Sequence, residues 1–186
     1  MTYLTSGIIL RASHFGDFDR QYVIYTKERG KIVALAKGVK KITSKLNSSL
    51  EFFNLCDLLL ARGYAFDRVA GVQLIRNYSR GELQPLKVFA AYFYLETLDL
   101  LTDYNFPDEF SFHLTERFLW EIFSADSARP ALLILNKFLF ELLSHLGYRP
   151  RLVAATQKIL LADLYQLIMV ATDKPVKSFA PLLSFI

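Results

Sequence analysis

The sequence is poor in the residues that stabilise covalently cross-linked or metal-bound folds. Among 186 residues there is one cysteine, Cys56, which excludes an internal disulfide and a cysteine-based zinc site. Cys56 lies in an apolar run, which favours a buried structural thiol over a nucleophile. Only eight Gly and six Pro occur, so collagen-like and low-complexity classes are excluded.

Long apolar runs are also missing. The most apolar stretches, such as residues 88–95, are far shorter than the roughly 18 residues of a membrane span. Residues 1–10 lack the charged and then apolar pattern of a signal peptide. We therefore expect a cytoplasmic protein without membrane association, which would be nucleoid-associated if it binds DNA.

Enzyme motifs are scarce. His14, His113 and His145 are not spaced as metal ligands, and the sequence has neither a Gly-x-Ser-x-Gly motif nor a Walker lysine. Asp17 and Asp19 could hold Mg²⁺, but two carboxylates in a loop do not by themselves predict a metal site. We predict a binding protein rather than an enzyme, with no cofactor, no metal and no small-molecule substrate.

Charge is distributed unevenly along the chain. Residues 1–80 contain 13 of the 22 Lys and Arg and six of the 18 Asp and Glu, a net charge of +7. Residues 81–186 contain the other nine and 12, a net charge of −3. The first half is a candidate for binding a polyanion and the second for protein contacts, although a basic surface can also serve only solubility.

The first half has the pattern of a small barrel. Short β-favouring runs are separated by turn signals, and we expect strands over residues 4–11, 21–26, 31–37, 52–62 and 69–78. The five-stranded OB barrel is the leading candidate, and an SH3-like barrel is the alternative that periodicity cannot separate from it.

The second half has helical periodicity, with helices expected over residues 85–102, 108–123, 127–146 and 158–170. The first of these is apolar around most of its circumference, which is typical of a helix buried within a bundle. The second is expected to bury Phe112, Phe118, Leu119 and Trp120. The predicted fold class is α+β in two parts: an OB-type barrel (1–80) followed by an all-α domain of about four helices (81–186).

A basic loop follows the third predicted strand. Lys37, Lys40, Lys41 and Lys45 surround Gly38, so ammonium groups can reach successive phosphates and release counterions. Solvated lysines that only protect a strand edge are the competing interpretation.

Aromatic residues accompany the basic loop, and they can stack on unpaired bases or pack into a core. Tyr22 and Tyr25 belong to opposite faces of one strand, so we expect at most one of them in the core. The aromatic residues in or beside the strands are Phe15, Phe18, Tyr22, Tyr25, Tyr64 and Phe66.

Several segments, in this order, resemble the bacterial recombination mediator family RecO. They are Phe-Gly-Asp-Phe-Asp at 15–19, Thr26 with Gly30, Lys-Gly-Val-Lys-Lys at 37–41 with Ser44, a Leu-Leu-x-x-Leu-Gly-Tyr-x-Pro segment at 142–150, and Lys-Pro-Val-Lys-Ser at 174–178. The resemblance implies an OB barrel, a helical domain and a function without bond-breaking catalysis. Such proteins bind single- and double-stranded DNA, anneal complementary strands, and with RecR help load RecA onto DNA coated by single-strand-binding protein (SSB).

The chain departs from the family pattern in two places. Asp17 stands where Glu is usual, and only 21 residues separate Leu152 from Lys174. Many relatives have a longer insertion there, often with four zinc-binding cysteines, so no zinc is expected here.

Two sets of cations are candidate contacts. For DNA phosphates they are Lys37, Lys40, Lys41, Lys45, Arg11, Arg20 and Arg62. For a partner peptide with an acidic tip, which the resemblance identifies as the SSB C-terminal tail, they are Arg117, Lys137, Arg149, Arg151, Lys158 and Lys177. A protein–protein adaptor without DNA binding and an RNA-binding OB protein remain alternatives.

Overall fold

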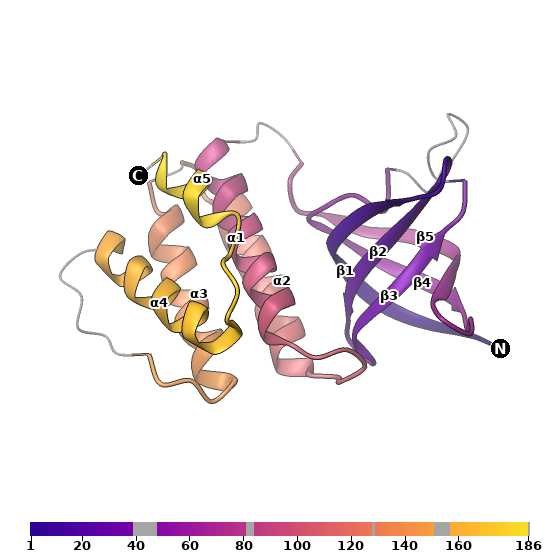
Figure 1. The fold of residues 1–186 in the computed structure, drawn as a ribbon. Coiled ribbons are helices and arrows are strands. Elements are labelled where there is room, and N and C mark those ends of the chain that lie inside the picture. The colour runs from indigo at the N-terminus through magenta and orange to yellow at the C-terminus, as the bar shows by residue number, and fades with distance from the viewer. Residues whose placement is uncertain (39–47, 81–83, 128, 151–156, 186) are drawn as a thin grey trace. The chain divides into compact units, whose positions relative to one another are not determined.

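The computed structural model describes residues 1–38, 48–80, 84–127, 129–150 and 157–185 (Figure 1). The strands are β1 (Thr2–Phe15), β2 (Asp19–Thr26), β3 (Gly30–Ala36), β4 (Asn54–Ala61) and β5 (Asp67–Asn77). The helices are α1 (Pro85–Leu101), α2 (Glu109–Ser124), α3 (Ala131–His145), α4 (Gln157–Thr172) and α5 (Phe179–Leu183). Among the described residues, none of the helices has both the length and the apolar character needed to cross a membrane.

The five strands form a closed barrel in the order β1-β2-β3-β5-β4. β3 and β5 pair in parallel, and the other pairs are antiparallel. The long β1 pairs with β4 through its first half and with β2 through its second, and a bulge between Ile9 and Arg11 lets it bend between them. This order confirms the OB-type barrel and excludes the SH3-like alternative.

The barrel interior is filled by alternate residues of each strand, as the two-residue period of a β-strand requires. On β2 and β3 the inward residues are Tyr22, Ile24, Ile32, Ala34 and Ala36. They meet Ile9 of β1 and Cys56, Leu58 and Leu60 of β4.

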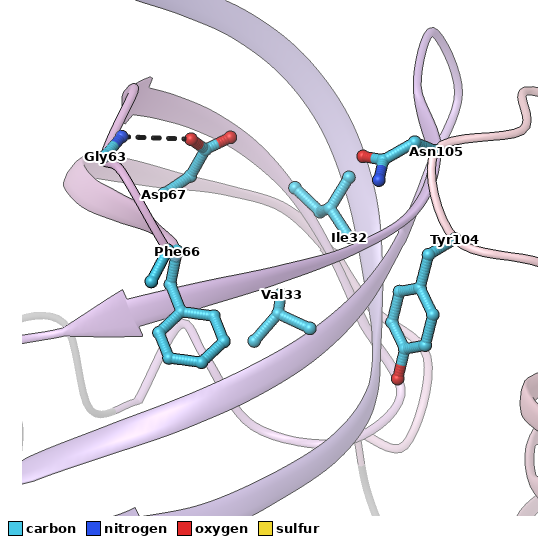
Figure 2. A pocket seen from close by; sticks show the side chains of 8 residues that line it. Ile32, Val33, Gly63, Phe66, Asp67, Tyr104 and Asn105 are labelled. Carbon is cyan, nitrogen blue, oxygen red and sulfur yellow. Dashed lines mark hydrogen bonds between the residues drawn. The ribbon is translucent and has the colours of Figure 1, made fainter.

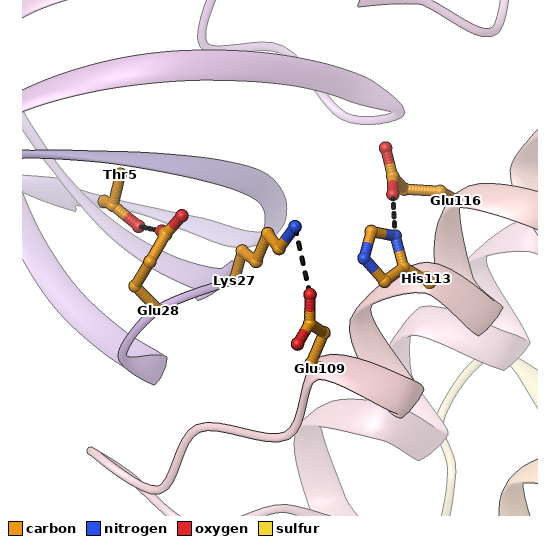
Figure 3. A network of polar contacts seen from close by, with 6 residues as sticks. All are labelled: Thr5, Lys27, Glu28, Glu109, His113 and Glu116. Carbon is orange, nitrogen blue, oxygen red and sulfur yellow. Dashed lines mark hydrogen bonds and ion pairs between the residues drawn. The ribbon is translucent and has the colours of Figure 1, made fainter.

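The segment Asp103–Phe112 forms one compact unit with the barrel (Met1–Ser79), and the remaining helical residues form the second unit. The Asn105 N–H donates to the Lys31 carbonyl at 2.9 Å, and the Lys27 ammonium lies 3.1 Å from the Glu109 carboxylate (Figure 3). Gly30 permits this packing because a Cβ there would lie 2.0 Å from the Phe106 carbonyl oxygen. The sequence analysis had assigned this segment to the helical half, since its docking depends on contacts distant in sequence.

The expectation that at most one of Tyr22 and Tyr25 is buried is wrong, because both are fully buried. Tyr22 faces the barrel interior. Tyr25 has the opposite register, and residues of the docked segment lie against it: burial raises the pKa of its hydroxyl, and the Asp108 carboxylate adds to the effect. Tyr25 points outward from the barrel but is buried, because the segment Asp103–Phe112 packs over it.

The helical unit is arranged around α1, as its apolar circumference predicted. α1 contacts α3, α4 and α5, and Phe93 and Tyr94 are fully buried on it. The Tyr94 ring stacks on Phe118 of α2 with centroids 4.1 Å apart. The short α5 was not expected from the sequence; its Phe179 ring stacks on Tyr165 of α4 at 3.7 Å.

One inward expectation for α2 is wrong. Phe112, Phe118 and Leu119 are buried, but Trp120 is 54% exposed. At 100° per residue Trp120 lies nearly opposite the buried stripe that Phe118 and Ile122 define.

Candidate nucleic-acid interface

Two loops meet at one end of the barrel. The β1–β2 loop (residues 16–18) and the β4–β5 loop (residues 62–66) are the connections through which OB barrels bind oligonucleotides. The rings of Phe15 and Phe66, at the edges of these loops, meet edge to face with centroids 6.5 Å apart. Phe15, Phe18 and Tyr64 are all exposed here. We call residues 15–18 and 62–66 the loop end of the barrel.

The basic segment after β3 begins beside the loop end. The Gly38 N–H donates to the Asp19 carboxylate at 2.8 Å, and Gly38 has a left-handed φ of 65°. Gly38 and the segment 15–19, which are separate in the sequence, are therefore joined by a hydrogen bond. Asp19, considered above as a Mg²⁺ ligand, serves as the acceptor that orients the start of this segment.

Of the lysines in the basic segment, Lys37 is described and its side chain is exposed. Lys40, Lys41 and Lys45 lie outside the described residues.

The structure separates the three predicted arginines. Arg62 is exposed at the loop end, with its guanidinium 6.0 Å from the Tyr3 ring centroid. Arg11 is exposed on β1, where it donates to the Tyr104 hydroxyl at 3.5 Å. Arg20 has the register of the interior residues of β2 and lies 3.9 Å from Glu51, so its charge is already partly compensated.

Sequence reasoning did not select Arg68, which is exposed at the start of β5. It pairs with Leu35 across the parallel β3–β5 ladder, so it lies beside the loop end and close to the start of the basic segment. Its place in the sequence, immediately after the β4–β5 loop, is the feature that could have identified Arg68 as a candidate DNA contact. Lys31, by contrast with Arg68, is a buried cation: it is 4% exposed, and its ammonium lies 4.5 Å from the Tyr104 ring centroid.

A pocket of about 240 Å³ opens between the loop end and the docked segment (Figure 2). Ile32 and Val33 of β3 lie between Phe66 and Asp67 on one side and Tyr104 and Asn105 on the other. Asp67 accepts hydrogen bonds from the Gly63 N–H, at 3.3 Å, and from the Tyr3 hydroxyl. The complete lining is Ile32, Val33, Gly63, Ala65, Phe66, Asp67, Tyr104 and Asn105.

Two titratable groups of the barrel, Cys56 and Tyr3, have pKa values that burial raises. Burial raises the pKa of the Cys56 thiol to about 12, with Asp57 adding to the effect, and the thiol donates to the Ser49 carbonyl at 3.0 Å. This confirms a buried structural thiol. Burial and the hydrogen bond to Asp67 raise the pKa of Tyr3. Within the described part of the chain, no three His, Cys, Asp or Glu side chains are grouped to hold a metal ion.

In the helical unit, two of the candidate partner-binding cations lie together and are already paired. Arg117 lies 3.5 Å from Glu141, and Lys137 lies 3.0 Å from Glu121. Both cations also lie over the Phe138 ring, at 5.3 Å and 4.7 Å from its centroid.

The other candidates in this unit do not join that pair in any described contact. Arg149 and Lys177 are exposed, and the backbone N–H of Lys177 donates to Glu96 at 2.8 Å. Arg151 and the side chain of Lys158 lie outside the described residues. On the exposed side of α2, His113 and Glu116 form a further polar contact at 2.7 Å (Figure 3).

Comparison with known proteins gives matches along most of the chain. The family model described as "Recombination protein O N terminal" matches residues 1–78, and "Recombination protein O C terminal" matches residues 83–156. A DNA repair protein RecO from Cutibacterium acnes is 33% identical over 156 residues, which are 82% of this chain and 63% of the relative. One from Desulfitobacterium hafniense is 31% identical over 155 residues, 83% of this chain and 55% of the relative. The chain thus spans less than two thirds of the length of these relatives.

Proposed function

The chain belongs to the RecO family, and from this membership we propose that it is a DNA-binding recombination mediator in DNA repair. The observation that supports DNA binding most directly is the convergence at the loop end. Exposed aromatic rings (Phe15, Phe18, Tyr64) and Arg62 lie at this end, which has the loops that OB barrels use for oligonucleotides, and the exposed cations Lys37 and Arg68 lie beside it.

The cations at the loop end supply affinity by neutralising phosphates and releasing counterions. Because phosphates carry no base identity, this part of the binding is independent of sequence. Exposed rings such as Phe18 and Tyr64 stack on unpaired bases, an interaction worth about 1–3 kcal/mol per base. Single strands therefore gain stacking energy on binding, whereas duplex DNA does not, because its bases are already stacked on one another.

Annealing follows from the same charges without breaking a covalent bond. Two complementary strands repel each other through their phosphates, and a protein that neutralises both lowers this repulsion while they pair. In this proposal the protein consumes no cofactor and acts on DNA in the cytoplasm, at the nucleoid. Together with RecR it helps RecA load onto SSB-coated single strands.

The helical unit is the proposed site for the acidic SSB tail. Glu141 and Glu121 occupy Arg117 and Lys137 in the free protein, so a carboxylate-bearing peptide has to replace them. Such an exchange of one carboxylate for another changes the electrostatic energy little, so apolar contacts of the peptide with exposed side chains must provide much of the affinity.

The test of DNA binding is fluorescence anisotropy with a labelled single strand across a salt series. We expect the double variant Lys37→Glu, Arg68→Glu to bind at least about tenfold more weakly, with a salt slope smaller by about 0.7 per lost phosphate contact. The control is Lys174→Glu, Arg129→Glu, which makes the same charge change at exposed positions of the helical unit. We expect the control to lose less than about threefold, the effect of net charge alone.

Three outcomes of this experiment would contradict the proposal. Equal losses in both double variants would show that the loop end is not the binding surface. No binding even at low salt would favour the adaptor. An affinity for RNA more than about tenfold above that for DNA would favour an RNA-binding OB protein, since the 2′-hydroxyl is what separates the two ligands.

A further inference from the structure

We infer that the pocket beside the loop end receives one unpaired nucleobase of the bound strand, with a preference for bases that carry an exocyclic amino group. This inference rests on the proposed DNA binding. It identifies which part of the ligand enters the pocket formed by Phe66, Asp67, Tyr104 and Asn105.

The lining of the pocket is unsuited to a phosphate. None of the eight described lining residues is a cation, and one of them, Asp67, is a carboxylate. A phosphate would meet like charge there. The nearby cations Lys31 and Arg11, which contact Tyr104, and Arg62 and Arg68 all lie outside the lining. The pocket therefore fits a neutral group connected to phosphates that are held elsewhere.

The side chains of the pocket match a flat ring with a polar edge. Phe66 lines the pocket on one side and Tyr104 on the other, and the outward-facing Val33 supplies an apolar surface between them (Figure 2). The Asn105 side-chain amide makes no hydrogen bond to the residues that the structure describes, so both its donor and its acceptor remain for a ligand. An asparagine amide pairs with the adjacent amino group and ring nitrogen of adenine, and cytosine presents the same pair of groups.

Asp67 adds the preference for an amino group. Its two oxygens accept from Gly63 N–H and the Tyr3 hydroxyl, but a carboxylate offers about four acceptor sites. The remaining sites suit an exocyclic amine and disfavour the O4 carbonyl of thymine. Adenine or cytosine should therefore enter in preference to thymine.

The size of the pocket favours a base within a strand over a free metabolite. About 240 Å³ is below the usual 300–1,000 Å³ of a pocket for a drug-sized molecule. A base attached to phosphates that the loop end already holds needs little affinity of its own, since its effective concentration at the pocket is high.

The test compares a labelled single strand with an abasic strand that has the same number of phosphates. Asn105→Gly removes the amide without altering charge, and glycine accepts the left-handed φ of 60° at this position. Ala65→Leu fills the pocket from an exposed loop position. Wild-type binding to the abasic strand measures phosphate capture, and the ratio of the two affinities measures base contacts.

We expect this ratio to fall about threefold or more in Asn105→Gly and about fivefold or more in Ala65→Leu, with abasic-strand affinity unchanged within twofold. An all-cytosine strand should bind the wild type several-fold more tightly than an all-thymine strand, and Asn105→Gly should reduce this difference to the part that Asp67 contributes. Unchanged ratios in both variants would overturn the pocket inference while leaving phosphate capture in place. Failure of the wild type to bind either strand would overturn the proposed function as well.

Discussion

At the scale of single residues, two glycines with the same backbone conformation have different surroundings. Gly16 and Gly30 have φ of 67° and 66°. A Cβ at Gly16 would meet nothing within 4 Å, whereas a Cβ at Gly30 would lie 2.0 Å from the Phe106 carbonyl oxygen. Both positions favour glycine because of their left-handed φ, but of the two only Gly30 also lacks the space for a side chain.

This difference gives a prediction with an internal control. Gly16→Ala should lower the free energy of unfolding by about 1 kcal/mol, the cost of a left-handed residue with a side chain. Gly30→Ala should lower it by at least about 3 kcal/mol, because it also displaces the docked segment at Phe106. Urea denaturation of both variants measures the difference, and equal losses would show that the segment yields without cost.

Cys56 provides a second residue-scale prediction. With a pKa of about 12, only about one thiol in ten thousand is ionised at pH 8, so native Cys56 should resist maleimide reagents and react once the barrel unfolds. Because burial raises the folded pKa, the contribution of the neutral thiol to stability is fully present below about pH 9 and is lost between about pH 9 and 12. The reactivity of Cys56 is measured by maleimide labelling time courses at increasing urea concentrations. Rapid labelling without denaturant would contradict a closed barrel.

At the scale of elements, a single carboxylate on α1 holds the C-terminal segment. Glu96 accepts hydrogen bonds from the Lys177 N–H at 2.8 Å, the Ser178 N–H at 2.9 Å and the Ser178 hydroxyl at 2.6 Å. These donors lie immediately before α5, whose Leu182 is fully buried. The segment 174–178, noticed in the sequence for its resemblance, thus has a structural role at this junction.

Glu96→Gln replaces one charged acceptor oxygen with an amide donor and should lower the free energy of unfolding by about 1–3 kcal/mol. Faster hydrogen exchange in residues 177–183 should accompany this loss. Glu121→Gln is the control, since it weakens only an exposed ion pair with Lys137 and should cost less than about 1 kcal/mol. Equal effects would mean that the Glu96 contacts contribute no more than a surface pair.

At the scale of the whole molecule, the charge of each unit limits the kind of partner that it can bind. The net charge of +7 in residues 1–80 belongs almost entirely to the barrel, which also has the exposed rings of the loop end. The chain spans 55–63% of the length of the two relatives described above. DNA binding is the activity that the described residues support most directly.

The sequence by itself determined the two kinds of secondary structure, a small barrel of five strands and the central position of α1, because each follows from a local repeat of apolar residues. The choice of the OB-type over the SH3-like barrel came from the order in which the strands pair. Two features were decided by tertiary structure: the burial of Tyr25 beneath the segment Asp103–Phe112 and the pocket beside that segment. The same holds for the contact between the motifs at 15–19 and 37–41, which depends on one hydrogen bond from Gly38 to Asp19. Periodicity reports which face of an element is apolar, but not which distant segment of the chain covers it.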